Sequence, residues 1–230
     1  ESVLAERIAQ WEEQLNPALS LAYLPSPGKV RLRLSAKGEK EQELAHLIEK
    51  AVEELKPIIG QFIFGYDDEQ PQKEIGRILT QRHQTLSVAE SCTGGYIANL
   101  ITGVSGSSAY FKGGVVAYSN EVKINLLGVD VSAIEQNGAV SRIVVEQMAL
   151  GVQRVLKTHY AIATSGIAGP LGGSDEKPVG TVWMAWATPE GVFSKKFQFG
   201  SIRERNILRS GETALILFQQ YINGVLSITD

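Results

Sequence analysis

The N-terminal part of the chain shows two periodic patterns of hydrophobic positions. Apolar residues recur at helical spacing over 3–15 and 39–57, and a proline ends each run. Apolar and polar residues alternate over 19–24 and 29–36, on either side of a Pro-Ser-Pro-Gly turn, which predicts a hairpin with one solvated face. A short apolar run at 61–66 predicts a third strand. The predicted order is helix, strand, strand, helix, strand, which makes a small α+β module.

A different pattern begins after a polar stretch that contains Pro71, and we place the domain boundary there, giving domains of residues 1–69 and 70–230. Helical and strand-like segments alternate from this point, as is typical of a parallel, buried sheet. The last two strands are joined by a very short turn, so this pair must be antiparallel. The predicted fold class is therefore α/β, a three-layer α/β/α domain with a mixed, largely parallel sheet, preceded by the small α+β domain. The predicted strands are 84–89, 113–118, 160–164, 180–188 and 191–199, and the predicted helices are 72–82, one from Gly94, 120–127, 142–157 and a closing helix over 208–225.

The composition is that of an ordinary globular chain, with 43% apolar residues and a net charge of -3, so no global charge points to nucleic acid or to an anionic membrane. The apolar runs are much shorter than the roughly 18 residues that span a bilayer, and no signal-peptide pattern opens the chain, so we expect a cytoplasmic protein with no membrane partner. The single cysteine excludes an internal disulfide, and three scattered histidines give no metal-ligand cluster. Because residue 1 is Glu rather than Met, we expect an N-terminal domain to be missing.

Three segments place small or polar residues directly after predicted strands, where α/β proteins bind ligands. They are residues 88–95 (VAESCTGG), 113–129 and 163–183. The third is a glycine-rich loop, and its length and glycine content favour a backbone that wraps a ligand over a turn that only reverses the chain. The sequence contains no Walker A or G-x-G-x-x-G motif, so the standard nucleotide-binding patterns are absent.

The first of these segments contains three candidate nucleophiles, Ser91, Cys92 and Thr93. A serine nucleophile needs a base, and no histidine lies in the three segments, so Lys123 after the next strand is the candidate. The alternative is that Ser91 only caps the following helix and that Lys123 is a solvated charge, and spacing alone favours this alternative. Cys92 is expected to be a small buried residue, because the sequence places no basic partner beside it.

Several long motifs in the second domain resemble one known family. The segments AESCTGGYIANLITGVSGSSAYFKGGVVAYSNEVKINLLGV, GAVS and SGIAGPLGGSDEKPVGTVW closely resemble the CinA C-terminal domain, the nicotinamide mononucleotide deamidase module, over about residues 72–225. The preceding α+β module resembles the KH-like segment that, in longer CinA proteins, follows an N-terminal molybdopterin-binding-like domain. The resemblance implies hydrolysis of the carboxamide of nicotinamide mononucleotide to nicotinate mononucleotide and ammonia, without a cofactor.

The resemblance also implies catalytic roles. Ser91, the serine of AESCTGG, is the expected nucleophile, and Lys123, the lysine of YSNE-x-K, is its expected base, with Tyr118 nearby as a third catalytic residue. A lysine base must be largely neutral near the working pH, so we expect burial or a neighbouring cation to depress its pKa. Backbone N–H groups around Thr93 and Gly94 are expected to stabilise the oxyanion.

The expected substrate-binding residues include an arginine for the phosphate. The family's usual glycine-aspartate-arginine motif reads GSIRERNILR in this chain, which leaves the arginine open between Arg203 and Arg205, and either could instead be a solvated surface charge. The full set of expected substrate-binding residues is Thr93, Gly94, Gly95, Ser165, Gly166, Ala168, Gly169, Arg203 and Arg205.

The KH-like resemblance raises a rival function, that of a catalytically silent nucleic-acid-binding or scaffolding fragment. KH domains clamp nucleic acid with a G-x-x-G loop between helices, and this module has none. Lys29, Arg31 and Arg33 form a basic strand face, but a solvated hairpin face explains them better. The sequence therefore favours nicotinamide mononucleotide over nucleic acid as a partner. We also expect a homodimer, and a link to the N-terminal domain of the longer proteins.

Overall fold

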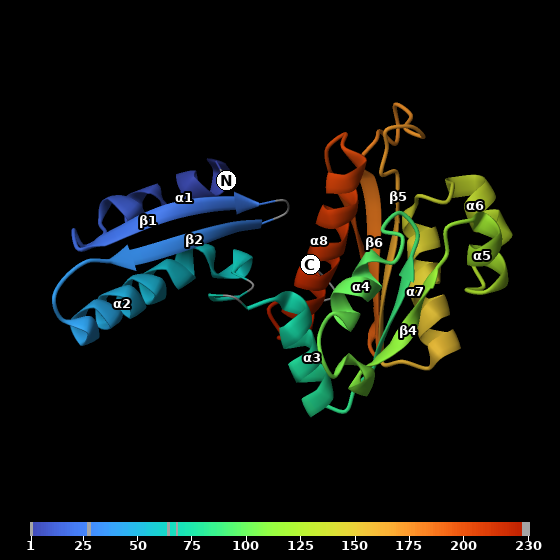
Figure 1. Cartoon of the computed structure of the whole chain (residues 1–230). Coiled ribbons are helices and arrows are strands. Elements are labelled where there is room, and N and C mark those ends of the chain that lie inside the picture. Colours follow the sequence, from blue (N-terminus) through green and yellow to red (C-terminus); the bar gives the residue numbers. More distant parts are fainter. Residues whose placement is uncertain (1, 27–28, 64, 68, 227–230) are drawn as a thin grey trace. The chain divides into compact units, whose positions relative to one another are not determined.

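The computed structural model describes residues 2–26, 29–63, 65–67 and 69–226 (Figure 1). The chain divides into two compact units, Glu1–Tyr66 and Asp67–Asp230. Each unit has a hydrophobic core of its own, because the buried apolar residues of the two units fall into separate clusters.

The first unit is a two-stranded antiparallel sheet with two helices on one face (Figure 1). Helices α1 (Ser2–Glu13) and α2 (Glu41–Ile59) pack against strands β1 (Leu19–Ser26) and β2 (Lys29–Ala36). Side chains alternate between the faces of a strand, so the leucines of β2 face the helices and its basic residues face away. The predicted hairpin with one solvated face is therefore present. Its buried core consists of Ile8, Trp11, Ala51, Leu55 and Ile59.

The predicted third strand at 61–66 is wrong. Gly60–Phe62 forms a 3₁₀ helix that continues α2, and the described residues 63, 65 and 66 form no strand, while Phe64 lies outside the described residues. Of this stretch, Ile63 packs against the core that contains Ile59, whereas Phe62 and Tyr66 are 49% and 44% exposed. A short apolar run therefore did not distinguish a strand from the end of a helix.

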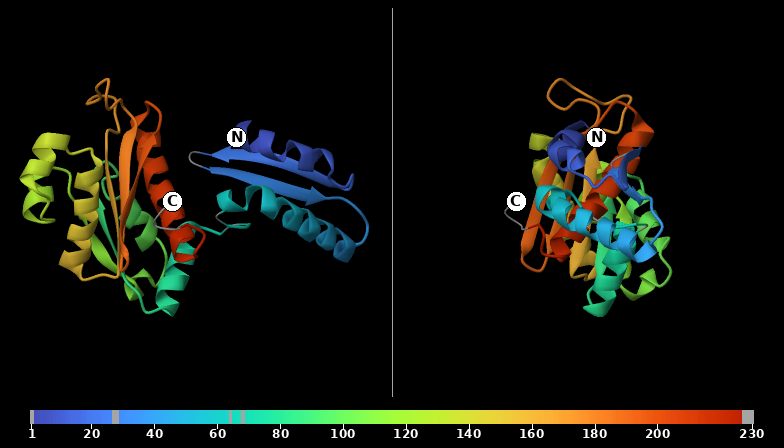
Figure 2. Two further views of the ribbon diagram at one scale, coloured as in Figure 1. Left: turned by 180° about the vertical axis from the view of Figure 1, so that it is seen from behind. Right: turned by 90° about the vertical axis from the view of Figure 1, so that its left-hand side faces the viewer.

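The second unit contains a five-stranded sheet in the order β4-β3-β5-β6-β7 (Figure 2). β3 (Leu86–Glu90) pairs in parallel with β4 (Phe111–Val116) and with β5 (Tyr160–Gly166). β6 (Thr181–Thr188) is antiparallel to β5 and to β7 (Gly191–Gln198), so every strand except β6 runs in the same direction. All residues of β3 are buried, as in a strand covered on both faces. The predicted mixed, largely parallel sheet is confirmed.

Helices cover both faces of this sheet and complete the three layers (Figure 1). One face carries a core that includes Trp186 and Phe218, and the other carries a core of alanine and valine residues around Met148. The α/β fold class predicted from the alternation is thus confirmed. The first face is covered by α3 (Pro71–Gln81), α4 (Tyr96–Thr102) and α8 (Arg203–Ile222), and the second by α7 (Arg142–Leu156) with α5 (Asn120–Asn125) and α6 (Val131–Asn137) beside it.

Two local differences from the sequence analysis bear on the candidate site. The helix expected from Gly94 begins at Tyr96, because Gly94 and Gly95 have φ angles of +62° and +100° that a right-handed helix does not accept. The short helix α6 was not predicted, although its last residue is followed by a segment that borders the site. Seven residues are too few to show a convincing helical period.

The parallel pairing places the carboxyl ends of three strands side by side at the same end of the sheet. Glu90, the last residue of β3, lies opposite Val116 of β4 and Thr164 of β5. The segments that follow these strands therefore meet at this end, where a ligand site is expected in an open α/β sheet.

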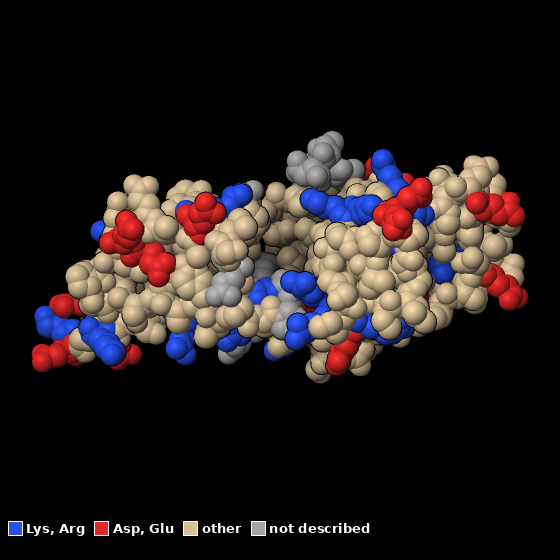
Figure 3. Space-filling model, turned by 90° about the horizontal axis from the view of Figure 1, so that it is seen from above, with Lys and Arg blue, Asp and Glu red and all other residues tan. Residues whose placement is uncertain are grey.

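The surface has no dominant charge on the face shown in Figure 3, where acidic and basic side chains are intermixed. Within the described residues, no helix combines the length and the apolar composition that crossing a membrane requires.

Candidate functional site

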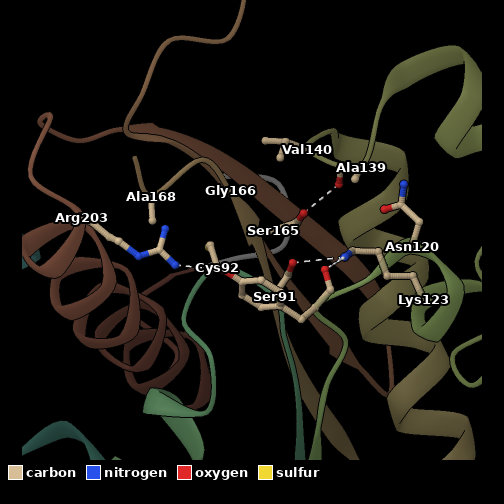
Figure 4. A pocket seen from close by; sticks show the side chains of 11 residues that line it. Ser91, Cys92, Asn120, Lys123, Ala139, Val140, Ser165, Gly166, Ala168 and Arg203 are labelled. Atoms are coloured by element: carbon tan, nitrogen blue, oxygen red, sulfur yellow. Dashed lines mark hydrogen bonds between the residues drawn. The ribbon is translucent and has the colours of Figure 1, made fainter. Parts of the chain in front are cut away.

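A pocket of about 240 Å³ lies at the carboxyl ends of β3, β4 and β5 (Figure 4). It contains two side chains with opposite character, a hydroxyl from Ser91 and an amine from Lys123. Among the residues that the structure describes, no carboxylate lines it, so a negatively charged ligand would meet none of these groups with its own sign. The lining residues are Ser91, Cys92, Tyr118, Asn120, Lys123, Ala139, Val140, Ser165, Gly166, Ala168 and Arg203.

Ser91 and Lys123 are direct hydrogen-bond partners. The distance between Ser91 Oγ and Lys123 Nζ is 3.1 Å, and Figure 4 shows the two side chains pointing toward each other. The hydroxyl is presented from the turn after β3, and the amine from α5, which follows β4. The two residues lie 32 positions apart in the sequence, and the parallel pairing of β3 with β4 brings them together.

Lys123 is buried, with 1% of its surface exposed. Its Nζ donates to the backbone carbonyls of Ala117 at 2.7 Å and Tyr118 at 3.4 Å, which turn toward it after β4 ends. Burial lowers the pKa of the amine below its usual value of 10.5, although the neighbouring Cys92 opposes this shift. In the structure Nζ donates to Ser91 Oγ as well. When the amine is neutral, its two N–H groups can stay with the two carbonyls, and its lone pair is then free to accept the hydroxyl hydrogen of Ser91.

The turn that carries Ser91 is fixed by the residue before it. Glu90 has 1% of its surface exposed, and its carboxylate accepts hydrogen bonds from the N–H groups of Gly95 at 3.0 Å, Ile97 at 3.1 Å and Ala98 at 2.8 Å. A carboxylate at a helix N-terminus satisfies N–H groups that have no partner within the helix and interacts favourably with the helix dipole. Glu90 thus joins the end of β3 to the start of α4 across the turn.

The opposite side of the turn is bonded to β5. The Ser91 N–H donates to the carbonyl of Thr164 at 3.0 Å, and the hydroxyls of Thr93 and Thr164 are 2.7 Å apart. The Gly94 N–H donates to the carbonyl of Ser91 at 3.2 Å. The expected oxyanion donor at Gly94 is therefore occupied within the turn. In the described part of the chain, the N–H groups of Cys92 and Thr93 donate to no backbone carbonyl, and that of Cys92 contacts its own thiol, so both remain available to a ligand.

Tyr118 and Arg203 form a second cluster in the pocket. Arg203 donates from Nη2 to the hydroxyl of Tyr118 at 2.9 Å and from Nη1 to the carbonyl of Gly169 at 2.9 Å. The Tyr118 hydroxyl thus contacts Arg203, while only its backbone carbonyl contacts Lys123. Figure 4 shows Arg203 and Lys123 on opposite sides of Ser91. Arg203 is the first residue of α8, whereas Arg205 is exposed and does not line the pocket.

The other expected substrate-binding residues fall into two groups. Ser165, Gly166 and Ala168 line the pocket, and Ser165 Oγ donates to the carbonyl of Ala139 at 2.7 Å. A side chain at Gly166 would meet Cys92 and β6 at 3.0 Å or less, so only glycine fits this close approach. The expected residues that do not line the pocket are Thr93, Gly94, Gly95, Gly169 and Arg205.

Cys92 lines the pocket but is buried, and burial raises the pKa of its thiol to about 12. A thiol with this pKa is almost entirely protonated near neutral pH and is a poor nucleophile. Cys92 is therefore a small packing residue here, next to the hydroxyl of Ser91.

The sequence analysis missed Glu90, Asn120, Ala139 and Val140. Asn120 belongs to YSNE-x-K, the motif that supplied Lys123, and Ala139 and Val140 belong to GAVS. Both motifs were recognised, but only Tyr118 and Lys123 of the first and no residue of GAVS were predicted as site residues. Within the described residues, no group of three or more His, Cys, Asp or Glu side chains is arranged to bind a metal ion.

Two family models match the chain. The CinA C-terminal domain matches residues 68–222, and the damage-inducible protein CinA KH domain matches residues 1–65. The chain belongs to the CinA family. A CinA-like protein from Flavobacterium psychrophilum is 50% identical over 223 residues, which cover 96% of this chain and 53% of that protein. A putative competence-damage inducible protein from Halothermothrix orenii is 41% identical over 96% of this chain and 54% of its own length. The chain thus spans about half the length of these curated CinA relatives.

Solved structures of CinA proteins share this architecture. A competence/damage inducible protein, CihA, from Agrobacterium tumefaciens is 37% identical with a TM-score of 0.64, covering 69% of this chain and 99% of that one. The competence damage-inducible protein A, ComA, from Klebsiella pneumoniae is 33% identical with a TM-score of 0.65, covering 67% of this chain and 98% of that one. The names of these relatives describe CinA-like or competence/damage-inducible proteins and specify no reaction.

Proposed function

We propose that this chain hydrolyses the carboxamide of nicotinamide mononucleotide to nicotinate mononucleotide and ammonia. The observation that carries the proposal is the hydrogen bond between Ser91 and a lysine that is buried and has a lowered pKa. A serine hydroxyl beside a neutral amine can be deprotonated as it attacks a carbonyl carbon, which is the first step of amide hydrolysis. The resemblance of the surrounding motifs to the nicotinamide mononucleotide deamidase module supports the carboxamide of this nucleotide as the substrate.

In the proposed first step, Ser91 Oγ attacks the amide carbon while the lone pair of Lys123 Nζ accepts the hydroxyl proton. The carbonyl oxygen becomes an oxyanion, and the N–H groups of Cys92 and Thr93 are the available donors for it. Lys123, now an ammonium, gives its proton to the amide nitrogen as the carbon–nitrogen bond breaks. Ammonia leaves, and the nicotinoyl group remains as an ester on Ser91.

In the second step, water attacks the ester carbonyl carbon. Lys123 accepts a proton from this water, and the same oxyanion forms and collapses. The ester bond to Ser91 breaks, Lys123 returns the proton to Ser91 Oγ, and the product leaves as the carboxylic acid, which loses its remaining proton to water to give nicotinate mononucleotide. The enzyme is regenerated, and no metal or cofactor is used in either step.

The rest of the pocket suits the rest of this substrate. Ala139, Val140 and Ala168 offer apolar contacts for the pyridine ring. Arg203 uses only part of its five N–H groups on Tyr118 and Gly169, so others are available for the phosphate, and the start of α8 adds a favourable dipole. In this proposal Tyr118 acts by holding Arg203.

The test is release of ammonia from nicotinamide mononucleotide by the purified chain. Ser91→Ala and Lys123→Ala are each expected to lower kcat by at least about 1,000-fold, because each removes a member of the reacting pair. Ser108→Ala and Lys112→Ala are matched controls at exposed positions outside the pocket and should keep full activity. A wild-type chain that binds the nucleotide but releases no ammonia would contradict the proposal.

The partners of the whole protein are also proposed. We expect a homodimer in the cytoplasm, joined in longer family members to an N-terminal molybdopterin-binding-like domain. Sedimentation equilibrium measures the oligomeric state, and a monomer at micromolar concentration would contradict the dimer.

A further inference from the structure

The glycine-rich loop at 167–179 is attached to the other side of the pocket by one lysine. Lys177 Nζ donates a hydrogen bond to the backbone carbonyl of Asn137, the last residue of α6. A helix C-terminus has carbonyl groups without intrahelical partners and a negative dipole end, so an ammonium is favoured there. Within the described residues, Lys177 takes part in no ion pair, and its ammonium group donates to the carbonyl of Asn137 instead.

The local backbone is shaped for this contact on both sides. Gly138 follows Asn137 with a φ of +74°, and an added Cβ would come within 3.2 Å of Lys177 Nζ. On the loop, the Lys177 N–H donates to Ser174 Oγ at 3.2 Å, and the Lys177 carbonyl accepts from the Ser174 N–H at 3.0 Å. A tight turn thus presents the lysine, and a glycine leaves room for its ammonium.

The two segments joined by Lys177 are two walls of the pocket. Directly after Gly138, Ala139 and Val140 line it, and Ala168 at the start of the loop lines it from the other side. A second bond joins the same walls at the bottom, from Ser165 Oγ to the carbonyl of Ala139 at 2.7 Å (Figure 4). Lys177 therefore closes a ring of contacts that runs from β5 through the loop to the end of α6 and back.

We infer that Lys177 is a positioning residue that sets the separation of the two walls and thereby the affinity of the pocket for its pyridine nucleotide. It does not line the pocket, so it acts through the 137–141 segment and the loop. This inference rests on the proposed function for the identity of the ligand but not for the coupling of the two walls. Without the ammonium, the loop keeps its hydrogen bonds at residues 167–169, 179 and 180 but loses its link to α6.

The kinetic test compares Lys177→Met, Lys177→Arg and the exposed control Lys196→Met with the unmodified chain. Loss of a charge-assisted hydrogen bond predicts a KM for nicotinamide mononucleotide about tenfold higher in Lys177→Met, with kcat within about twofold, because Ser91 and Lys123 are untouched. Lys177→Arg keeps the charge and the donor and should recover most of the affinity. Equal KM values in Lys177→Met and Lys196→Met would overturn the inference.

An independent test uses Cys92, the single cysteine of the chain, as a reporter in the pocket. The rate of its reaction with a small neutral maleimide is expected to rise about tenfold in Lys177→Met, because separated walls expose the thiol. In Lys177→Arg the rate should return to that of the unmodified chain. An unchanged rate would overturn the inference. A changed rate in a chain that releases no ammonia would uphold the coupling and reject the proposed reaction. If Lys177→Met does not fold, Lys177→Gln, which keeps a donor without the charge, takes its place in both measurements.

Discussion

The turn at residues 91–95 and the loop at 167–179 both contain glycines, and both follow the carboxyl end of a parallel strand, but they are held very differently. The turn is fixed by the buried carboxylate of Glu90 on one side and by Thr164 on the other. The loop is bonded at its base, where Arg203 and Asn206 of α8 donate to its first carbonyls, and at Lys177, whereas Leu171 on its outer part is 85% exposed.

This difference matches the demands of the two tasks in the proposed reaction. A nucleophile and its oxyanion donors must be held within a fraction of an ångström of the reacting carbon, so they belong on a rigid turn. Recognition of the rest of the substrate tolerates adjustment, and adaptable loops supply it in many enzymes. The comparison teaches that glycine content alone does not identify a mobile segment, because Gly94 and Gly95 of the turn provide positive φ angles within a firmly bonded segment.

The largest effect is expected from Glu90→Gln, which removes the fixation of the turn. An amide presents one carbonyl oxygen and directs its NH₂ group at N–H donors, so the N-terminus of α4 loses acceptors. Loss of buried hydrogen bonds to a charged group predicts a free energy of unfolding lower by about 2–4 kcal/mol, and displacement of Ser91 predicts a kcat lower by about 100-fold. Urea unfolding and ammonia release measure the two quantities.

Glu121→Gln is the matched control, since Glu121 lies in the first turn of α5 but is exposed. It should change the unfolding free energy by less than about 0.5 kcal/mol. Equal stability of the two variants would show that Glu90 does not fix the turn.

The sequence was sufficient to predict that Ser91 and Lys123 lie together, but not to predict the residues that hold them in place. Ser91 and Lys123 were found because their motifs are specific, and the pairing of β3 with β4 brings them into contact. Glu90 stood in the same motif, but its role depends on three backbone N–H groups that a sequence does not display. Which of Arg203 and Arg205 reaches the pocket likewise depends on where α8 begins. The hydrophobic pattern of a sequence determines such element boundaries poorly.

The fold was predictable to a similar extent. The alternation of helices and strands predicted the α/β class of the second unit, because alternating helices and strands pack as a parallel sheet covered by layers of helices. The third strand predicted at 61–66 failed, since an apolar run of six residues has no period that separates strand from helix end.

The second effect is expected from Arg203→Met, which changes the recognition side of the pocket and leaves the turn intact. Loss of a charge-assisted contact with the phosphate predicts a KM for nicotinamide mononucleotide about 10- to 100-fold higher, with little change in kcat. Arg205→Met is the control two positions along the same helix, outside the pocket. With nicotinamide riboside, which has no phosphate, Arg203→Met and the unmodified chain should have similar KM values. A similar rise of KM with both substrates would place the phosphate elsewhere.

The third effect concerns the pH dependence of stability near the turn. The folded pKa of Lys123 is lowered, so the unfolded chain binds more protons above that pKa, and the free energy of unfolding rises with pH until the usual lysine value of 10.5. One such group adds a slope of at most about 1.4 kcal/mol per pH unit. Lys123→Met should remove this slope, as measured by urea unfolding at a series of pH values, whereas the exposed control Lys112→Met should keep it. An unchanged slope in Lys123→Met would mean that the amine is not desolvated.

The same ionisation should appear in catalysis. Only the neutral amine accepts the proton of Ser91, so kcat/KM is expected to rise with pH through an ionisation below 10.5.

The smallest effect is expected at the outer part of the loop. Leu171→Ser removes a large apolar side chain, but the side chain is 85% exposed and does not line the pocket, so both the unfolding free energy and the KM should stay close to those of the unmodified chain. Leu215→Ser is the buried counterpart in α8, with 1% of the residue exposed, and should lower the unfolding free energy by about 3 kcal/mol or more. If Leu171→Ser instead raised the KM, the outer loop would fold onto the bound nucleotide. The loop would then act as a cover for the substrate as well as a wall of the pocket, and its looser attachment would serve closure rather than only adjustment.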